Sequence, residues 1–235
     1  MLARQTYSKR RWPNTPEFNS VLESLKEGNS IRLLELVWKG YDVFCADTLF
    51  QVDCSQDDDD LERDITQLLE PKIREVMTGY EPFYVQHGPY EHESWLGGSA
   101  QPPQYDIAFI LQCNPRVMWP LEAKVLRTHG SVAEYVNEIR SNFLTCRYSP
   151  FSNEAAMLGY LLSGDSNTVF KNIADKGGWK LNSHPHFPYR EHRTSDHQRE
   201  IPEGKSYPIQ FCCHHLVLQL QPSQPLANTK LHCMM

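Results

Sequence analysis

Two short apolar segments joined by a turn signal constrain the fold of this chain more than any other feature. Residues 106–111 read Asp-Ile-Ala-Phe-Ile-Leu, and residues 117–126 read Val-Met-Trp-Pro-Leu-Glu-Ala-Lys-Val-Leu, with Asn114-Pro115 between them. Apolar runs of this length are typical of strands, and the Asn-Pro dipeptide marks a turn. The sequence therefore predicts an antiparallel β-hairpin whose residues are apolar enough to belong to a core.

Three charged residues lie within this apolar hairpin. A turn centred near Asn114 places Asp106 opposite Glu122, within side-chain reach. Glu122 and Lys124 are two residues apart on one strand, so their side chains point to the same face. Two carboxyl groups and one ammonium group are therefore expected to converge at one place, while the residues between them on the opposite face are apolar.

The Glu-x-Lys pattern occurs three times in the chain, so its surroundings decide which copy is informative. Glu70-Pro-Lys72 lies in a helical pattern, where residues two apart do not share a face. Glu203-Gly-Lys205 lies in a loop rich in Pro and Gly. Only Glu122-Ala-Lys124 lies in an apolar strand that follows a strand led by an acid. An ion pair on an exposed strand is the alternative interpretation, but the apolar opposite face requires burial.

A long amphipathic helix is expected before the hairpin. Apolar residues recur at helical spacing from about residue 59 to residue 76. Acids occupy positions 57–60, and negative charge there stabilises the first turn of a helix through its dipole. Pro71 predicts either a kink or the start of a second helix. A short strand is expected at 82–86, between this helix and the hairpin.

Further elements are expected after the hairpin. A helix is predicted from residue 131 to about residue 146, with Ser131 as its cap. Residues 155–163 fit either a strand or a helix, and residues 175–208 are polar without clear periodicity. A last strand is predicted at 209–220. Strands that alternate with helices in this way indicate an α/β fold.

With these elements around them, Asp106, Glu122 and Lys124 resemble the motif of the PD-(D/E)XK nucleases, the restriction-endonuclease-like superfamily. Asp106 matches the first acid, and Glu122 and Lys124 match the (D/E)xK element. Tyr105 stands where the motif nominally has Pro. The likeness covers residues 58–165, and it implies a small mixed β-sheet flanked by helices, with these three residues catalysing phosphodiester hydrolysis, most often in DNA.

The same residues also have a chemical interpretation of their own. Two carboxylates offer hard oxygen ligands for Mg²⁺ or Mn²⁺, and such a cation can polarise a phosphoryl oxygen and lower the pKa of bound water. A neighbouring lysine can hold or deprotonate the attacking water and offset charge on the phosphorus. We therefore expect Asp106 and Glu122 to be metal ligands and Lys124 to assist the reaction.

The superfamily often has one further acid on the helix before the hairpin, and Glu62 and Asp64 are the candidates. Glu62 borders the apolar stripe near the start of the predicted helix. Asp64 lies about 200° further round and is expected to face solvent. We therefore expect Glu62 to be the third metal ligand, with a capping or surface role as the alternative.

Nucleic-acid binding needs a local basic surface, because the net charge of the chain is −6. Candidates in the late polar segment are Arg190, Arg193, His197 and Arg199, although this segment also fits a solvent-exposed loop. A second basic cluster lies in the arm formed by residues 1–20.

Six histidines lie between residues 184 and 215, so a zinc site is conceivable, although no HExxH or zinc-finger spacing occurs. A Ser-His hydrolase lacks the Gly-x-Ser-x-Gly elbow. Four residues after the hairpin are candidates to brace the predicted site, Tyr135, Glu138, Arg147 and Tyr148, with core packing as the favoured role of the two tyrosines.

Taken together, the sequence predicts an N-terminal helical or arm region at 1–52, a nuclease-like domain at 53–220 and a tail at 221–235. The predicted function is nuclease activity on DNA that depends on Mg²⁺ or Mn²⁺. The predicted setting is restriction, phage defence or repair, and the protein is expected to act as a homodimer or with a partner subunit. A catalytically inactive binding or scaffold module on the same fold is the alternative, and a histidine-based metal hydrolase is another. Scattered cysteines and the lack of long apolar runs favour a cytoplasmic protein without membrane contact.

Overall fold

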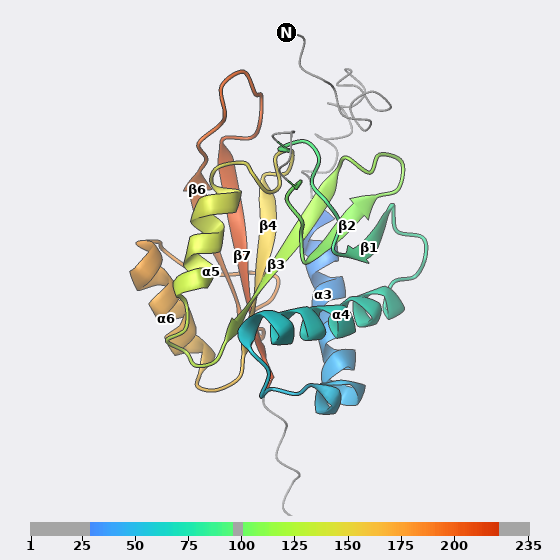
Figure 1. Ribbon diagram of the computed structural model, residues 1–235, viewed down its shortest axis with the longest axis vertical. Coiled ribbons are helices and arrows are strands. Elements are labelled where there is room, and N and C mark those ends of the chain that lie inside the picture. The colour runs from blue at the N-terminus through green and yellow to red at the C-terminus, as the bar shows by residue number, and fades with distance from the viewer. Residues whose placement is uncertain (1–28, 96–100, 221–235) are drawn as a thin grey trace, which may run out of the picture.

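The computed structural model of the 235-residue chain describes residues 29–95 and 101–220, so the predicted arm at 1–20 and tail at 221–235 lie outside the described residues. The described residues form an α/β fold, with one open seven-stranded mixed sheet and helices on both of its faces (Figure 1). This confirms the predicted fold class of a mixed sheet flanked by helices.

Within residues 29–95 and 101–220, two α-helices precede the first strand and two more lie among the later strands. The order is α3 (Asn29–Asp47), η1 (Leu49–Gln51), α4 (Asp58–Glu75), β1 (Phe83–His87), β2 (Ile107–Leu111), β3 (Met118–Leu126), α5 (Ala133–Glu138), η2 (Ile139–Phe143), β4 (Glu154–Leu161), α6 (Ser166–Gly177), β5 (Asn182–Ser183), β6 (His192–Gln198) and β7 (Gln210–Gln219).

The strands lie in the sheet in the order β1-β2-β3-β4-β7-β6-β5. β1, β2 and β3 pair antiparallel, β3 and β4 pair parallel, and β4 pairs parallel with β7. β7, β6 and β5 then pair antiparallel at the other edge. The parallel strands at the centre are fully or nearly fully buried, as expected where helices cover both faces.

The predicted hairpin register is confirmed. Ile107 pairs with Leu121 and Phe109 pairs with Trp119, which is the pairing expected for a turn centred near Asn114. The paired residues of β2 and β3 end with Ile107 and Leu121, so Asp106 lies one position beyond the last pair, on the level of Glu122. The hydrophobic pattern fixed this register, because a slip by one residue would turn the apolar face of β3 away from the core.

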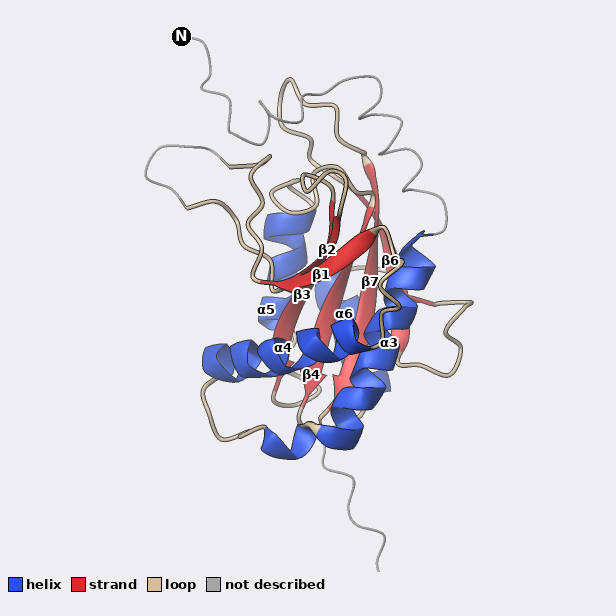
Figure 2. Ribbon diagram, turned by 90° about the vertical axis from the view of Figure 1, so that its right-hand side faces the viewer, coloured by secondary structure: helices blue, strands red, loops and turns tan. Residues whose placement is uncertain are grey.

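Two apolar layers hold the helices to the sheet. On one face, apolar residues of α3 and α4 pack against the odd-numbered residues of β3, which include Trp119 and Leu121. On the other face, apolar residues of α5 and α6 pack against alternate residues of β4 and β7. Figure 2 shows α3 and α4 in front of the sheet and α5 and α6 behind it. Apolar residues of α3 and of α4 therefore belong to one core layer against the same face of the sheet.

Helix α4 begins and continues as its sequence implies, with one difference. Asp57 is the N-cap, and its side chain accepts a hydrogen bond of 3.0 Å from the backbone N–H of Asp60. The buried positions include Leu61, Ile65 and Leu69, the predicted stripe. The helix runs through Pro71 to Glu75, so no second helix starts at the proline. A proline in this position removes one backbone hydrogen bond, and the buried stripe on both sides of it favours continuation.

Two expectations for the later elements need correction, and one open alternative is settled. The predicted long helix at 131–146 is the short α5 followed by a π-helical turn, and its N-cap is Val132 without a side-chain hydrogen bond, so Ser131 is not the cap. The ambiguous segment at 155–163 is β4. The segment at 190–199 is not a solvent-exposed loop, because most of it forms β6, whose pairing with β7 buries alternate side chains.

The helices described in residues 29–95 and 101–220 include none that is long and apolar enough to cross a membrane.

Candidate active site

Antiparallel pairing of β2 and β3 brings the predicted site residues together. Asp106 lies directly before β2, and its Oδ2 accepts a hydrogen bond of 2.7 Å from the backbone N–H of Ala123. That bond fixes the Asp106 carboxylate beside β3 between Glu122 and Lys124. The convergence expected from the spacing of these three residues is therefore present, and Ala123 contributes a backbone donor that no sequence pattern could have indicated.

Glu62 joins this group from the first turns of α4. Lys124 Nζ donates to Glu62 Oε1 at 2.7 Å, and both side chains are largely buried, with exposed fractions of 21% and 15%. Asp64 instead accepts a hydrogen bond of 2.8 Å from Gln56 Nε2 and makes no described contact with the hairpin. Glu62 therefore lies where the helix register places it, whereas Asp64 is half-buried against Gln56 rather than fully in solvent.

Glu122 is the most unusual member of the group. It is 4% exposed, and its Oε1 has no hydrogen-bond partner among the residues that the structure describes. Burial, together with the charges of Asp106 and Glu138, raises the pKa of Glu122 well above its usual range. An unpartnered buried carboxyl oxygen is costly to the fold, and such groups in native proteins call for an explanation such as a bound ion.

The two neighbouring carboxyl groups interact directly. Burial also raises the pKa of Asp106, although the Ala123 N–H and the charge of Lys124 oppose this shift. A hydrogen bond between the carboxyl groups lowers the pKa of Asp106 and raises that of Glu122. Two acids so close cannot both ionise easily, and the shared hydrogen bond favours ionisation of Asp106 over that of Glu122.

The lysine of the group is held in its charged form. Burial lowers the pKa of Lys124, but the charges of Glu62, Asp106 and Glu138 outweigh burial and raise this pKa above its ordinary value. Burial raises the pKa of Glu62 to about 7, although the neighbouring Lys124 opposes that shift. The cluster therefore holds more acid than base, and it can lower its free energy by taking up a proton or a cation.

The donor set fits a hard divalent cation. Glu122 offers a buried oxygen with no described partner, and Asp106 lies beside it with a carboxylate held in place by a backbone N–H. Mg²⁺ and Mn²⁺ prefer such oxygen ligands and usually retain several waters. Glu62 is bonded to Lys124 through Oε1, so in this arrangement it holds the lysine of the group.

Residues that flank the hairpin complete the surroundings of the site. Tyr105 is buried, donates from its hydroxyl to Glu91 Oε2 at 2.8 Å and accepts from the backbone N–H of Ser149 at 2.8 Å. Tyr148 packs edge-on against the Tyr105 ring. Glu138 at the end of α5 adds negative charge that raises the pKa values of Glu122 and Lys124. Of the four expected bracing residues, Glu138 and Tyr148 therefore influence the site.

The four residues expected to bind nucleic acid do not gather around this site. Arg190 makes a two-pronged ion pair with Asp42, at 2.7 and 2.5 Å, and Arg193 lies over the Phe170 ring. His197 and Arg199 are buried by internal contacts. Arg199 donates 2.9 Å hydrogen bonds to two backbone carbonyls and stacks on a phenylalanine ring. Of the four, only Arg190 and Arg193 retain exposed surface that a phosphate could reach.

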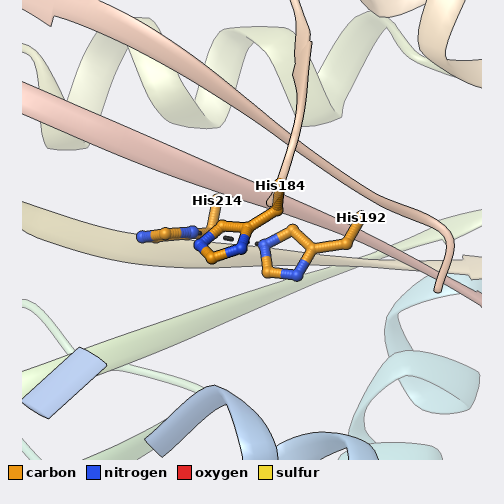
Figure 3. A group of neighbouring side chains, drawn as sticks. All are labelled: His184, His192 and His214. Carbon is orange, nitrogen blue, oxygen red and sulfur yellow. Dashed lines mark hydrogen bonds between the residues drawn. The ribbon is translucent and has the colours of Figure 1, made fainter. Parts of the chain in front are cut away.

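The late histidines form two separate groups on opposite faces of β6 and β7. On the α5–α6 face, the Ser195 hydroxyl is hydrogen-bonded to His197 Nε2 at 2.6 Å and to His215 Nε2 at 2.7 Å. Ser195 is fully buried, so this Ser-His contact cannot present a nucleophile to a substrate. On the α3 face, His184, His192 and His214 lie together (Figure 3). Sequence spacing does not separate these groups, because the segment with His192 and His197 resembles a loop although it forms the strand β6.

Comparisons of the chain with protein-family models, with curated proteins and with solved structures find no match. The functional interpretation therefore depends on the geometry of the described residues.

Proposed function

We propose that this protein is a metal-dependent nuclease that hydrolyses phosphodiester bonds, with DNA as its substrate. The observation that carries the proposal is the convergence of Asp106, Glu122 and Lys124 at one buried place, where a Glu122 oxygen lacks a described hydrogen-bond partner. Clustered acids lower the stability of a fold, so function is the simplest reason to retain them.

The order of elements around the site supports the same proposal. Helix α4, the antiparallel strands β1, β2 and β3, helix α5, and β4 parallel to β3 follow one another in the chain. This order agrees with the PD-(D/E)XK resemblance, in which the first acid begins one strand of the hairpin and the (D/E)xK element lies on the next. The resemblance adds DNA as the substrate, because the residues alone indicate only a phosphodiester.

Asp106 and Glu122 would hold Mg²⁺ or Mn²⁺, which when bound supplies polarisation of the phosphoryl oxygen and a more acidic water. Glu122 must lose its proton to act as a ligand, so binding of the cation is favoured as the pH rises. Asp106 is already oriented by the Ala123 N–H, which lowers the cost of arranging the site.

Lys124 acts through its charge in this proposal. Its raised pKa keeps the amine protonated, so it is suited to orient a water or a phosphate oxygen and to offset negative charge that develops on phosphorus. Glu62 is a positioning residue, since it holds Lys124 Nζ at 2.7 Å. Restriction, phage defence and repair remain the proposed settings, and a homodimer would supply two sites for two strands.

Cleavage assays test this proposal directly. Purified protein is incubated with plasmid and with single-stranded DNA in Mg²⁺ or Mn²⁺, beside Lys124→Ala and a control, Lys171→Ala, which alters an exposed lysine of α6. We expect cleavage by the wild type and by Lys171→Ala and its loss in Lys124→Ala and in EDTA.

Undiminished cleavage by Lys124→Ala, or robust cleavage in EDTA, would overturn the proposal. Absence of cleavage by the wild type together with absence of Mg²⁺ binding in calorimetry would instead support the alternative of an inactive binding or scaffold module.

A further inference from the structure

Three buried histidines meet on the α3 face of the sheet, away from the candidate active site. His192 lies on β6, His214 lies on β7, and His184 comes from the loop between β5 and β6, so three separate segments converge (Figure 3). Their exposed fractions are 0%, 3% and 8% respectively. Each residue offers one ligand atom, and these atoms all lie within 4.8 Å of one another.

The spacing of two of these rings already suits a metal. His192 Nε2 and His214 Nδ1 are 3.2 Å apart. Zn–N bonds are about 2.0–2.1 Å long, so two nitrogens of a tetrahedral Zn²⁺ site lie about 3.3 Å apart. The His184 ring stacks on His192 with its centroid 4.7 Å away, and its ligand atom lies within 4.8 Å of those of the other two histidines.

The second nitrogen of His214 faces an appropriate outer partner. His214 Nε2 is buried without a described hydrogen bond, and the nearest charged atom is Glu154 Oε2 at 3.7 Å. Histidine ligands of zinc usually donate their other N–H to a carboxylate or a carbonyl, which orients the ring and raises its basicity. Glu154 occupies that position for a metal bound at His214 Nδ1.

Without a metal, the hydrogen-bond pattern assigns the protons along this group. Trp38 Nε1 can only donate, and it points to His192 Nδ1 at 3.4 Å, so the proton of His192 lies on Nε2 and is shared with His214 Nδ1. A cation between the two rings must replace that proton. The proton of His192 then lies on Nδ1, so this atom no longer accepts a hydrogen bond from Trp38 Nε1. The bond that is lost, at 3.4 Å, is longer than the 3.2 Å bond between His192 and His214.

We propose that His184, His192 and His214 bind one Zn²⁺ ion, with Glu154 as the outer carboxylate of His214. Imidazole nitrogens suit Zn²⁺ and similar transition metals, whereas Mg²⁺ prefers oxygen ligands. The ion joins the β5–β6 loop to the central strand β7, and this site does not depend on the proposed nuclease activity.

Metal titrations of the full chain test the site. Protein freed of metal by a chelator is titrated with Zn²⁺ by calorimetry and with Co²⁺ by visible absorption, without nucleic acid or Mg²⁺. We expect one Zn²⁺ per chain, the spectrum of tetrahedral Co²⁺, and at least a tenfold loss of affinity in His184→Gln and in His192→Gln. The control is His186→Gln, an exposed neighbour whose side chain is not part of the group, and it should bind as the wild type does.

Tryptophan emission gives a second readout. Zn²⁺ should change the emission of the wild type, and most of this change should be absent in Trp38→Phe, because the Trp38 N–H loses its acceptor when the metal binds. His184 lies in a loop, so His184→Gln keeps the test valid if His192→Gln does not fold. Absence of stoichiometric Zn²⁺ in the wild type, or equal affinity in His184→Gln and His186→Gln, would overturn the site and leave the nuclease proposal untouched.

Discussion

Two separate clusters of titratable side chains lie against one sheet, and they differ in almost every chemical respect. The hairpin cluster consists of Asp106, Glu122, Lys124 and Glu62, and it offers oxygens. The histidine cluster consists of His184, His192 and His214, and it offers nitrogens. Burial opposes charge in both, so it raises the pKa values of the acids and lowers those of His184 and His192.

The consequence of burial is opposite for the two clusters. Glu122 in the hairpin cluster must release a proton before it binds a cation, and the charges of Asp106 and Glu138 further disfavour its ionisation. Burial instead favours the neutral forms of His184 and His192, which are the forms that bind a cation. Desolvation therefore favours the cation-binding form of these two imidazoles and disfavours that of the Glu122 carboxyl group, whose proposed cation binding then depends on pH.

The largest expected effect concerns the acids of the hairpin cluster. Asp106→Asn and Glu122→Gln should each reduce the cleavage rate a hundredfold or more, because each removes a metal ligand from the proposed reaction. Initial rates on plasmid in Mg²⁺ measure this effect. The matched control is Glu203→Gln, which alters an exposed glutamate from a Glu-x-Lys pattern in a loop. A wild-type rate in either hairpin variant would remove that residue from the site.

A smaller effect is expected on α4. Glu62→Gln should lower kcat about tenfold, on the order of 1.4 kcal/mol of barrier, because Glu62 positions Lys124 but is not bonded to the other acids. Asp64→Asn should remain within about twofold of the wild type, since Asp64 is bonded to Gln56. Single-turnover and steady-state rates at saturating DNA measure both variants. The reverse order of effects would show that α4 presents a different face to the hairpin.

The smallest expected effect is on stability and depends on pH. The raised pKa of Glu122 means that the folded state keeps a proton that the unfolded state has lost, so stability falls as the pH rises above the ordinary pKa of glutamate. Glu122→Gln removes this penalty. It should raise Tm at pH 8 by about 2–4 °C, which corresponds to about 1 kcal/mol for a chain of this size, and by less at pH 5. Thermal melts at both pH values in EDTA test the sign, and a larger gain at pH 5 would contradict it.

The hairpin cluster was predictable because its signals are local. The alternation of apolar residues fixed the pairing of β2 with β3, and that pairing alone places Asp106 on the level of Glu122. The helical stripe of α4 placed Glu62 on the correct side for the same reason. What the sequence could not indicate was the backbone donor of Ala123 and the ion pair between Glu62 and Lys124, which depend on how α4 lies against the sheet.

The histidine cluster was not predictable, because its residues come from segments whose pairing is not local. The polar sequence of β6 resembles a loop, and only its pairing with β7 buries His192 and Ser195. His184 precedes β6 by several residues and has no periodic signal. The segment containing Arg199 was misinterpreted for the same reason, since its charge suggested solvent whereas its guanidinium lies between backbone carbonyls and an aromatic ring.

Strand β3 serves both clusters through its two faces. Trp119 lies on the α3 face with its ring centroid 6.1 Å from that of His214, while Glu122 and Lys124 point to the other face. This arrangement limits the insertions and deletions that β3 can tolerate. A deletion or insertion of one residue between Trp119 and Glu122 would exchange the faces and disrupt both clusters at once, whereas a change of two residues would preserve the faces. Among homologous chains, insertions and deletions in β3 should therefore be confined to the ends of the strand.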